Sequence, residues 1–587
     1  MADSQGTPGP GGTGGRKELS MEIRLLIAFL LMGAVLFITP YFYKSSPPPP
    51  APKPAATSTG QTTTTPAATP PAATEPAKPA EPAATTPAQS ATAAAEEQTF
   101  VVETSLYQIR FSNRGAVVQS WLLKRFNDHN GKPLQLLNEA AAAKAGYPFS
   151  WIFKQQQPTT DPNKALFVMT PDADGLGVSF EYSDGHSVFR KAFHFTKDSY
   201  LSRVRSEAIV NGAPTPHLLA WRGGFGDETN YAAAATQHTV FYDLEDTGTF
   251  HSGGKLRTQS AKDAKKGTLT DRGNYSFAGI QDTYFTAVFL ERQGGHMELD
   301  TYSDDVSNTP GGKPEPYVGM GVGDGGSLRF LAYVGPKDVD ILGAVDPRLK
   351  TLIDWGWFEV LAKPLFYSLR WVDRNVAHNY GWSIVLVTIA INLLLLPLRF
   401  SSLKSSRKMQ ALAPQLKAIN DKYKNISLRD PRKAEQNQEV MELYKKNGVN
   451  PVGGCLPMLP QIPILYAFYT VLRVAIEMRG AHWLWVTDLS QPEQLTIRIL
   501  PLALIITQFV VQKMTPTPSA DPNQARMMMF MPLMFGIFFW SYQSGLVLYW
   551  LTGNLVSMAQ QWGMNRFGPA PPAPVEVVKT SGKKKGK

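Results

Sequence analysis

Residues 379–398 read NYGWSIVLVTIAINLLLLPL, a run without a charged side chain between His378 and Arg399. At about 1.5 Å per residue, a helix of this length spans roughly 30 Å, the thickness of the hydrocarbon core of a bilayer. Thr388 and Asn392 are spaced i to i+4, so they project from the same face of that helix. We therefore expect a membrane-spanning helix with a polar face.

Other uncharged runs predict further membrane spans. They are 25–43, 447–472, 495–512, which contains only Arg498, and 527–565. The last run is about twice the length of one crossing, and its polar segment 541–545 divides it into two helices joined by a tight turn. This gives six transmembrane α-helices, an anchor at 25–43 and a five-helix core within 379–565. Bulky residues follow the first run, which favours an uncleaved anchor, and a signal peptide is the alternative.

The composition changes twice between the first span and the second. Residues 44–98 are rich in Pro, Ala and Thr and cannot bury a core, so we expect an extended linker. Residues 99–345 carry short alternating apolar runs separated by Gly, Asn, Asp and Pro, which predicts a large antiparallel β-sandwich domain. One segment of this domain, 139–145, is expected to be helical. The chain has a single cysteine, Cys455, so no disulfide framework is expected.

Two segments of helical periodicity flank the run at 379–398. Residues 352–377 predict an amphipathic helix lying on the membrane surface, with Lys363, Arg370 and Arg374 away from its apolar stripe. Residues 399–450 predict a coiled-coil hairpin. Its first seam is Met409, Leu412, Leu416, Ile419 and Tyr423, and its weaker second seam is Ala434, Asn437, Met441 and Tyr444.

Charge sets the expected topology. The formal net charge is +10, and the hairpin 399–450 holds twelve Lys or Arg against five Asp or Glu, which places it in the cytoplasm. The terminal segments 1–24 and 566–587 are then also cytoplasmic, and the β domain lies on the other side. Basic residues beside apolar runs favour this topology signal over DNA binding. Contact of the hairpin and tail with a ribosome or nascent chain is the further possibility.

Polar side chains in the predicted spans suggest a wet groove. Moving polar segments through hydrocarbon costs several kcal/mol for each unsatisfied group, and amide or hydroxyl side chains lower that cost. The candidate lining is Thr388, Asn392, Gln461, Gln508, Gln512, Tyr549, Thr552 and Asn554. Hydrogen bonding between neighbouring helices is the alternative for each of them. A cluster of flexible methionines, Met527, Met528, Met529, Met531 and Met534, would suit varied substrates.

Motifs for enzymatic chemistry are missing from the sequence. The nine histidines form no HExxH, and no glycine loop matches a phosphate-binding loop. We therefore expect no enzyme activity, no cofactor and no metal. A small-solute transporter with an exported regulatory domain is an alternative function, but such proteins usually show internal repeats and intramembrane charges. An anchored carbohydrate-binding or mutarotase-like enzyme is a third.

Several motifs together resemble the YidC/Oxa/Alb family of bacterial membrane protein insertases, in its Gram-negative form. They are Gly381-Trp382-Ser383, Pro397-Leu398, Asn450-Pro451-Val452-Gly453-Gly454-Cys455, Gln461-Ile462-Pro463, Gln512-Lys513-Met514 and Ser544-Gly545-Leu546-Val547-Leu548-Tyr549-Trp550. The resemblance implies an insertase and folding chaperone of the inner membrane that works alone or with the Sec translocon on nascent membrane proteins. It also implies a periplasmic β domain of supersandwich type, similar to sugar mutarotases.

The resemblance also assigns residues, with one departure. Thr388 and Tyr549 match groove residues of the family, and Trp550 stands where a second tyrosine often occurs. Asn392 falls where the family usually has a groove arginine. Arg399 lies seven residues further on at nearly the same azimuth, so we hypothesise that it supplies the positive charge at the cytoplasmic mouth. The basic residues of that mouth are Arg399, Lys404, Arg407 and Lys408.

Overall fold

The computed structural model describes residues 91–567 except 129, 156, 228–236, 246–253, 292–295, 308–312, 424–431, 450–457 and 515–521. For 433, 458–459, 522–529 and 531 it describes the backbone alone. The chain divides into a first unit, Met1–Thr85, and a second, Thr86–Lys587. The expected anchor at 25–43, the linker up to residue 90, the tail beyond residue 567 and the side chains of Met527, Met528, Met529 and Met531 therefore lie outside the described residues.

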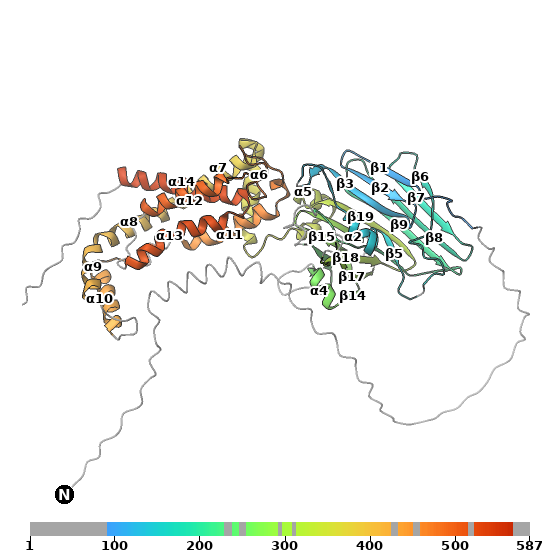
Figure 1. Ribbon diagram of the computed structural model, residues 1–587, viewed down its shortest axis with the longest axis horizontal. Coiled ribbons are helices and arrows are strands. Elements are labelled where there is room, and N and C mark those ends of the chain that lie inside the picture. The colour runs from blue at the N-terminus through green and yellow to red at the C-terminus, as the bar shows by residue number, and fades with distance from the viewer. Residues whose placement is uncertain are drawn as a thin grey trace, which may run out of the picture. The chain divides into compact units, whose positions relative to one another are not determined.

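The β domain contains three antiparallel sheets (Figure 1). The four-stranded sheet has the order β1 (Thr99–Glu103), β2 (Tyr107–Ser112), β3 (Val117–Asn127), β4 (Pro133–Gln135). The ten-stranded sheet has the order β13 (Lys255–Ser260), β12 (His238–Asp243), β15 (Tyr275–Gln281), β16 (Phe285–Leu290), β19 (Ser327–Pro336), β9 (Leu201–Val210), β8 (Ser187–His194), β7 (Gly177–Ser183), β6 (Val168–Pro171), with β10 (Ala213–Pro214) paired to β9. The five-stranded sheet has the order β14 (Thr270–Gly273), β17 (Met297–Val306), β18 (Glu315–Gly323), β11 (Leu218–Trp221), β5 (Ser150–Ile152).

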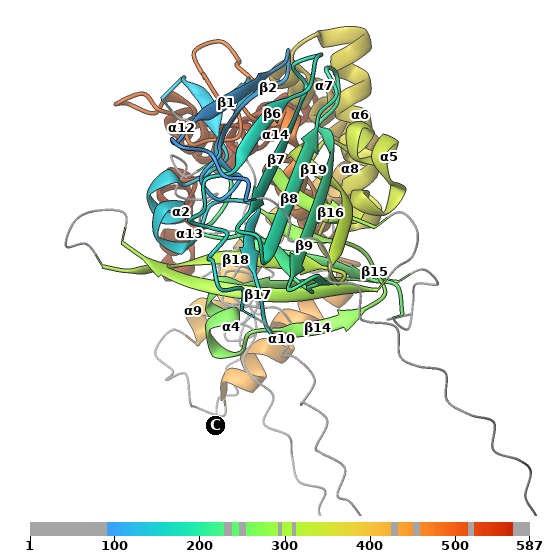
Figure 2. The same cartoon turned by 90° about the vertical axis from the view of Figure 1, so that its right-hand side faces the viewer.

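Alternation along the strands separates the faces of the large sheet. Strands β7, β8, β9, β19 and β16 lie side by side, and β17 and β18 run across them (Figure 2). On the exposed face, Arg190 of β8 is directly opposite Glu181 of β7 and Glu207 of β9 and pairs with both. On the buried face, the rings of Phe193 and Phe111 lie 4.9 Å apart, which joins the large sheet to β2 of the small one. The sandwich is therefore held by aromatic packing between its layers.

The predicted β-rich domain is confirmed, but it holds more helix than expected. α2 (Glu139–Ala145) coincides with the helical segment predicted there. The expectation of a single helix is wrong, because α4 (Ala261–Lys266) and α5 (Val339–Val345) are also helical. Both are one to two turns long, too short for a periodicity to stand out.

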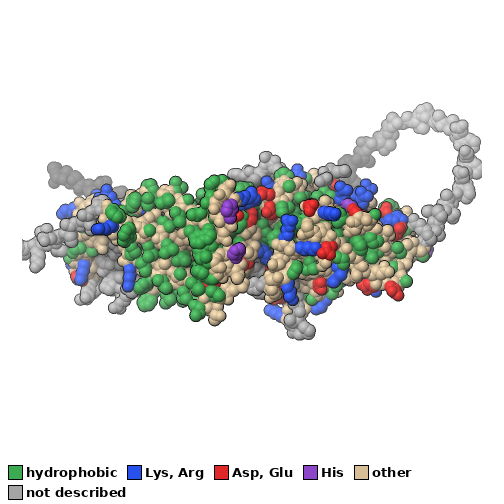
Figure 3. Space-filling view, turned by 90° about the horizontal axis from the view of Figure 1, so that it is seen from above, with side chains coloured by type: hydrophobic (Ala, Val, Ile, Leu, Met, Phe, Trp, Pro, Cys, Tyr) green, Lys and Arg blue, Asp and Glu red, His purple; other side chains and the backbone are tan. Residues whose placement is uncertain are grey.

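Helices make up the rest of the described chain. They are η1 (Pro347–Leu352), α6 (Glu359–Val372), η2 (Asp373–Ala377), α7 (Tyr380–Leu394), α8 (Leu396–Ala411), α9 (Ala413–Lys422), α10 (Arg432–Lys446), α11 (Met458–Val474), η4 (Ile476–Met478), α12 (Ile499–Met514), α13 (Pro522–Phe539) and α14 (Ser544–Phe567). The turn expected at 541–545 overlaps the break between α13 and α14, but α14 already begins at Ser544. On the face drawn in Figure 3, hydrophobic side chains cover the helical region, while charged side chains are spread over the β domain.

Length and apolar composition single out few of these helices. Within the described parts of the chain, no single helix is both long enough and apolar enough to cross a bilayer. The helical segments Glu359–Ala377 and Tyr380–Leu394 have that length and composition together, with a bend of 113° between them. Ile499–Met514 is a shorter apolar helix. The bend has a local cause. His378 is in the left-handed region at φ 49°, and the Asn379 side chain then accepts hydrogen bonds from the N–H groups of Gly381 and Trp382 as an N-cap.

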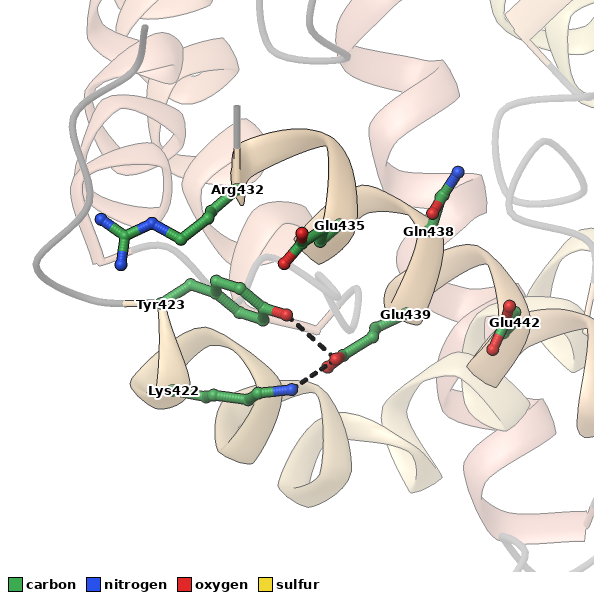
Figure 4. A pocket seen from close by; sticks show the side chains of 7 residues that line it. All are labelled: Lys422, Tyr423, Arg432, Glu435, Gln438, Glu439 and Glu442. Carbon is green, nitrogen blue, oxygen red and sulfur yellow. Dashed lines mark hydrogen bonds and ion pairs between the residues drawn. The ribbon is translucent and has the colours of Figure 1, made fainter. Parts of the chain in front are cut away.

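The basic hairpin packs along a different second seam from the one predicted. Met409, Leu412, Leu416 and Tyr423 of the first seam are buried, as expected. The second seam is wrong, because Ala434, Asn437 and Met441 are exposed and only Tyr444 is buried. Val440 and Leu443 pack on the core in their place, since their branched apolar side chains fill it. Near the tip, Tyr423 and Lys422 both donate to the carboxylate of Glu439 beside a pocket of about 520 Å³ (Figure 4).

Two buried arginines join the β domain to the helical region. Arg479 pairs with Asp227 at 2.6 Å, with side chains only 8% and 2% exposed. Arg370, expected on a solvated stripe of the surface helix, is instead buried; it donates to Asp340 of α5, and its Nε lies 3.5 Å from Glu477. Both are held by carboxylates distant in sequence, because a buried charge needs a partner.

Glu477 makes the stability of this junction depend on pH. Burial raises the pKa of Glu477 to about 7 from 4.5, although Arg370 opposes the shift, so the folded protein favours the neutral acid. Relative to Glu477→Gln, the free energy of unfolding of the wild type is therefore highest below pH 4.5. It decreases by roughly 3 kcal/mol as the pH rises through about 7. Thermal unfolding midpoints of the detergent-purified protein between pH 4.5 and 8 measure this change.

The control is Glu359→Gln on α6, where Glu359 is exposed and pairs with Lys363 one turn away. Its midpoint difference from the wild type should stay constant over the same pH range. An equally constant difference for Glu477→Gln would contradict the role given to Glu477.

Candidate functional site

Thr388 and Asn392 are buried in α7, which packs against α14. The hydroxyl of Thr388 donates to the Ile384 carbonyl of its own helix, and Asn392 Nδ2 donates to the Thr388 carbonyl at 2.7 Å. Asn392 Oδ1 is buried and has no hydrogen-bond partner among the residues that the structure describes. A buried acceptor left without a donor costs about 1–3 kcal/mol. Asn392 is therefore a destabilising residue at this place in the fold.

Arg399 is linked to Asn392 through α14. Its guanidinium donates to Ser557 Oγ and, at 3.3 Å, to Gln560 Oε1. Gln560 Nε2 in turn donates to the backbone carbonyl of Asn392 at 3.3 Å. Among the described residues, no carboxylate forms an ion pair with Arg399. Gln560 of α14 thus bridges the Arg399 guanidinium and the backbone carbonyl of Asn392.

Tyr549 connects α14 to α11. Its hydroxyl accepts a hydrogen bond from Gln461 Nε2 at 3.0 Å, and its ring stacks on Phe468 with the centroids 4.3 Å apart. Tyr549 is only 3% exposed, whereas Gln461 is half-buried. The pair predicted from sequence is therefore in direct contact, and the Gln461 carboxamide is the member that other groups could reach.

A second set of polar contacts joins α14 to α12. Trp550 Nε1 donates to Gln508 Oε1 at 3.3 Å, and Asn554 Nδ2 donates to Thr507 Oγ1 at the same distance. Gln512, also half-buried, lies one turn beyond Gln508 on α12. Thr552 bonds only the Leu548 carbonyl of its own helix. Gln461, Gln508 and Asn554 thus take part in polar contacts between α14 and its neighbours α11 and α12, whereas Thr388 and Thr552 bond carbonyls of their own helices. We call these contacts, together with those of Arg399 and Asn392 to Gln560, the polar cluster.

The other basic residues of the predicted mouth are more exposed. Arg407 is half-buried and donates to Asn565 Oδ1 at 2.7 Å, which ties α8 to the end of α14. Lys404 and Lys408 are exposed on α8. Arg399 is therefore the member of this set that reaches the polar cluster.

Sequence reasoning missed the part of the cluster that lies beyond Asn554. Ser557, Gln560 and Gln561 continue the polar side of α14, and Gln561 Nε2 donates to the Met514 carbonyl at the end of α12. The signal was available, since Tyr549, Gly553 and Ser557 follow one another at i+4 spacing and Gln560 is next on the same side. Thr388 and Asn392 line neither the pocket of about 520 Å³ at the hairpin tip nor the one of similar volume between α12 and α13. A wet groove at these two residues stays a prediction.

Comparisons with known proteins cover most of the chain. Residues 99–368 match the model of the YidC periplasmic domain, and residues 371–570 match that of the 60Kd inner membrane protein. The membrane protein insertase YidC of Pelobacter propionicus is 32% identical over 496 residues, covering 81% of this chain and 88% of that protein. The YidC of Geotalea daltonii is 32% identical over 563 residues, covering 94% and 100%. A crystal structure of an active YidC insertase with its first transmembrane domain resolved aligns with a TM-score of 0.35 at 18% identity, covering 92% of this chain and 99% of that one.

The unpartnered oxygen of Asn392 makes a stability prediction. Asn392→Leu removes the buried acceptor at similar volume, so we expect the free energy of unfolding to rise by about 1–2 kcal/mol. Thermal unfolding of the detergent-purified variant measures it. Thr388→Val is the matched control on the same face, and it should change stability by less than about 0.5 kcal/mol, because its hydroxyl bonds only its own helix. A lower midpoint for Asn392→Leu than for the wild type would contradict the prediction.

Proposed function

Because the chain belongs to the YidC family of membrane protein insertases, we propose that it inserts membrane proteins by way of the polar cluster around α14, acting as a groove open to the cytoplasm and to lipid. The protein is an insertase and not an enzyme, so it makes and breaks no covalent bond. Its work is to lower the cost of moving polar chain through hydrocarbon. The observation that carries the proposal is the buried Asn392 Oδ1, which has no partner among the described residues, in a residue whose backbone carbonyl is linked through Gln560 to Arg399, a cation that pairs with no described carboxylate.

The side chains of the cluster are suited to exchanging hydrogen bonds. Gln461, Gln508 and Gln560 are carboxamides with both donors and acceptors, so each can release its present partner and bond a passing peptide group. Uncharged amides do this without the desolvation cost of a bare ion. The apolar part of the client then leaves sideways into lipid, because burial there is favourable. No nucleotide is required for that step.

Arg399 gives the groove a preference for acidic segments. A guanidinium in a low-dielectric surrounding attracts a carboxylate more strongly than it would in water. Hydrogen bonds to Ser557 and Gln560 hold it in place and leave its charge uncompensated among the described residues. In this chain Arg399 takes over the attraction that Asn392, as an uncharged amide, cannot supply.

The topology that fits this function is a six-helix one. The anchor 25–43 and the five-helix core within 379–565 cross the inner membrane, with the termini and the hairpin 399–450 in the cytoplasm and the β domain in the periplasm. The excess of basic residues in the hairpin and the match of residues 99–368 to a periplasmic domain support it. Nascent membrane proteins are the clients. The further partners that we propose are the Sec translocon and a ribosome that binds the basic hairpin.

Crosslinking tests whether clients enter the cluster. A photo-reactive side chain at position 392 should crosslink a stalled nascent membrane protein, because the groove places the client against that face of α7. Position 394 on the same helix is the matched control, since Leu394 is 79% exposed on another face. Strong crosslinks from position 394 with none from position 392 would show that clients bind outside the cluster.

Substitution of Arg399 tests the charge preference. Arg399→Gln should slow insertion of a client with an acidic translocated tail by roughly tenfold, the equivalent of about 1.4 kcal/mol, and should leave a client with a neutral tail unchanged. Arg399→Lys keeps the charge and should retain most of the activity. Arg407→Gln, which loses a contact to Asn565 outside the cluster, serves as the control. Unchanged insertion of the acidic client by Arg399→Gln, together with impairment by Asn392→Ala, would refute the assignment.

A further inference from the structure

An apolar cavity opens on the outer surface of the helical region, away from the polar cluster. It has a volume of about 520 Å³ between α12 and α13. Its lining is Ile505, Leu533, Ile537, Trp540 and Ser541. Leu533 and Ile537 are 51% and 69% exposed, so the cavity is reached from the surroundings of the helices.

The helices α12 and α13 are in close contact at one side of the cavity. A Cβ built on Gly536 would lie 2.0 Å from Ile505 Cγ1, so the glycine lets α13 pack directly on α12 at this point. Beside that contact, Leu533, Ile537 and Trp540 follow one another at i, i+4 and i+7 on one stripe. The stripe is about 10 Å long, which suits a linear hydrocarbon segment laid along α13.

A cation lies at the Trp540 end of the stripe. Arg498, directly before α12, donates to the Trp540 carbonyl, and its guanidinium carbon lies 5.6 Å from the centroid of the Trp540 ring. In the part of the chain that the structure describes, Arg498 forms no ion pair with a carboxylate. The carboxylate of Glu493 is engaged elsewhere, by the N–H groups of Ile499 and Leu500 and by Trp485 Nε1. A positive charge without a counter-ion thus borders an apolar cavity.

We propose that this cavity binds one phospholipid of net negative charge, with an acyl chain along Leu533 and Ile537 and the phosphate on Arg498. The guanidinium presents several N–H donors, of which the Trp540 carbonyl takes one, so the others can bond phosphate oxygens in pairs. Ser541, exposed at the rim, adds a hydroxyl donor for the headgroup. Tryptophan beside arginine is typical of the level where headgroups lie.

The lining selects this occupant over others. A polar solute would find one serine and four apolar side chains, too little to replace its hydration. A zwitterionic lipid carries its own ammonium group, which weakens its attraction to an arginine that has no counter-ion. The proposal requires α12 and α13 to lie in a membrane, but it does not rest on the insertase groove.

Native mass spectrometry of the full chain tests the proposal, with phosphatidylglycerol or phosphatidylethanolamine added to the detergent-purified protein. Phosphatidylglycerol should bind at least about tenfold more tightly than phosphatidylethanolamine, and Arg498→Gln should weaken it by about tenfold, the value of one charge-assisted contact. Leu533→Trp, which fills the cavity and leaves the charge in place, should also weaken it. Lys363→Gln is the control, because Lys363 is a cation on α6 that already pairs with Glu359.

Three outcomes would overturn the proposal. They are equal binding of the two lipids, undiminished phosphatidylglycerol binding by either Arg498→Gln or Leu533→Trp, and an equal loss with Lys363→Gln. If Arg498→Gln does not fold, Arg498→Lys replaces it and should retain the phosphatidylglycerol binding that Leu533→Trp loses. A photo-reactive side chain at position 537 should crosslink lipid in membranes. Crosslinks there only to segment 25–43 or to a client would assign the cavity to a protein segment.

Insertion assays separate this inference from the proposed function. Arg498→Gln should leave the preference for acidic clients unchanged, because that preference rests on Arg399. Failure of the lipid site therefore leaves the groove standing, and failure of the groove leaves the lipid site standing.

Discussion

The hydrogen bonds that α14 makes with α7 and α8 are the constraint from which the rest of the helical region follows. In hydrocarbon each polar group must find a partner inside the protein, so a helix that carries Asn392 can pack only where such partners exist. Gln560 supplies one for its backbone carbonyl, and Arg399 binds the same glutamine. Oδ1 of Asn392 has no hydrogen-bond partner among the described residues. A chain built for stability alone would have an apolar side chain there, and the cost of keeping the amide is the reason to regard this place as functional.

The same rule governs the junction with the β domain, where charges are involved. Arg479 is almost completely buried, and it is tolerated because Asp227 and the Asn127 carbonyl receive its donors. The rings of Tyr284 and Phe285 lie 5.7 and 5.4 Å from its guanidinium carbon. These contacts tie the segment after α11 to strands of the sandwich. The helical region and the β domain are therefore joined by specific buried pairs as well as by the chain that connects them.

Much of this architecture is readable from the sequence, for physical reasons. The absence of charge in 379–398 and 527–565 predicts the helical runs, and alternation predicts strands such as β8 and β9, because each pattern reflects what the two faces of an element contact. Features set by distant partners are not readable in this way. The burial of Arg370 depends on Asp340 and Glu477, and the hairpin uses Val440 and Leu443 where spacing alone favoured Ala434 and Met441. The polar residues of these helices were predicted as a set, but the contacts of Arg399 with Ser557 and Gln560 required the packing of α14.

The central claim is that the polar cluster, closed around Asn392 in this structure, opens to the cytoplasmic side, and thiol accessibility tests it most directly. Cys455 is the single cysteine, so Asn392→Cys in a Cys455→Ser background places one thiol at the cluster. The account predicts that a membrane-impermeant maleimide labels this thiol from the cytoplasmic side of inverted membrane vesicles, whereas a thiol placed at Leu386 by Leu386→Cys, on the 40% exposed outer side of α7, stays unlabelled. An unreactive thiol at position 392 in folded protein, reactive only after denaturation, would contradict it.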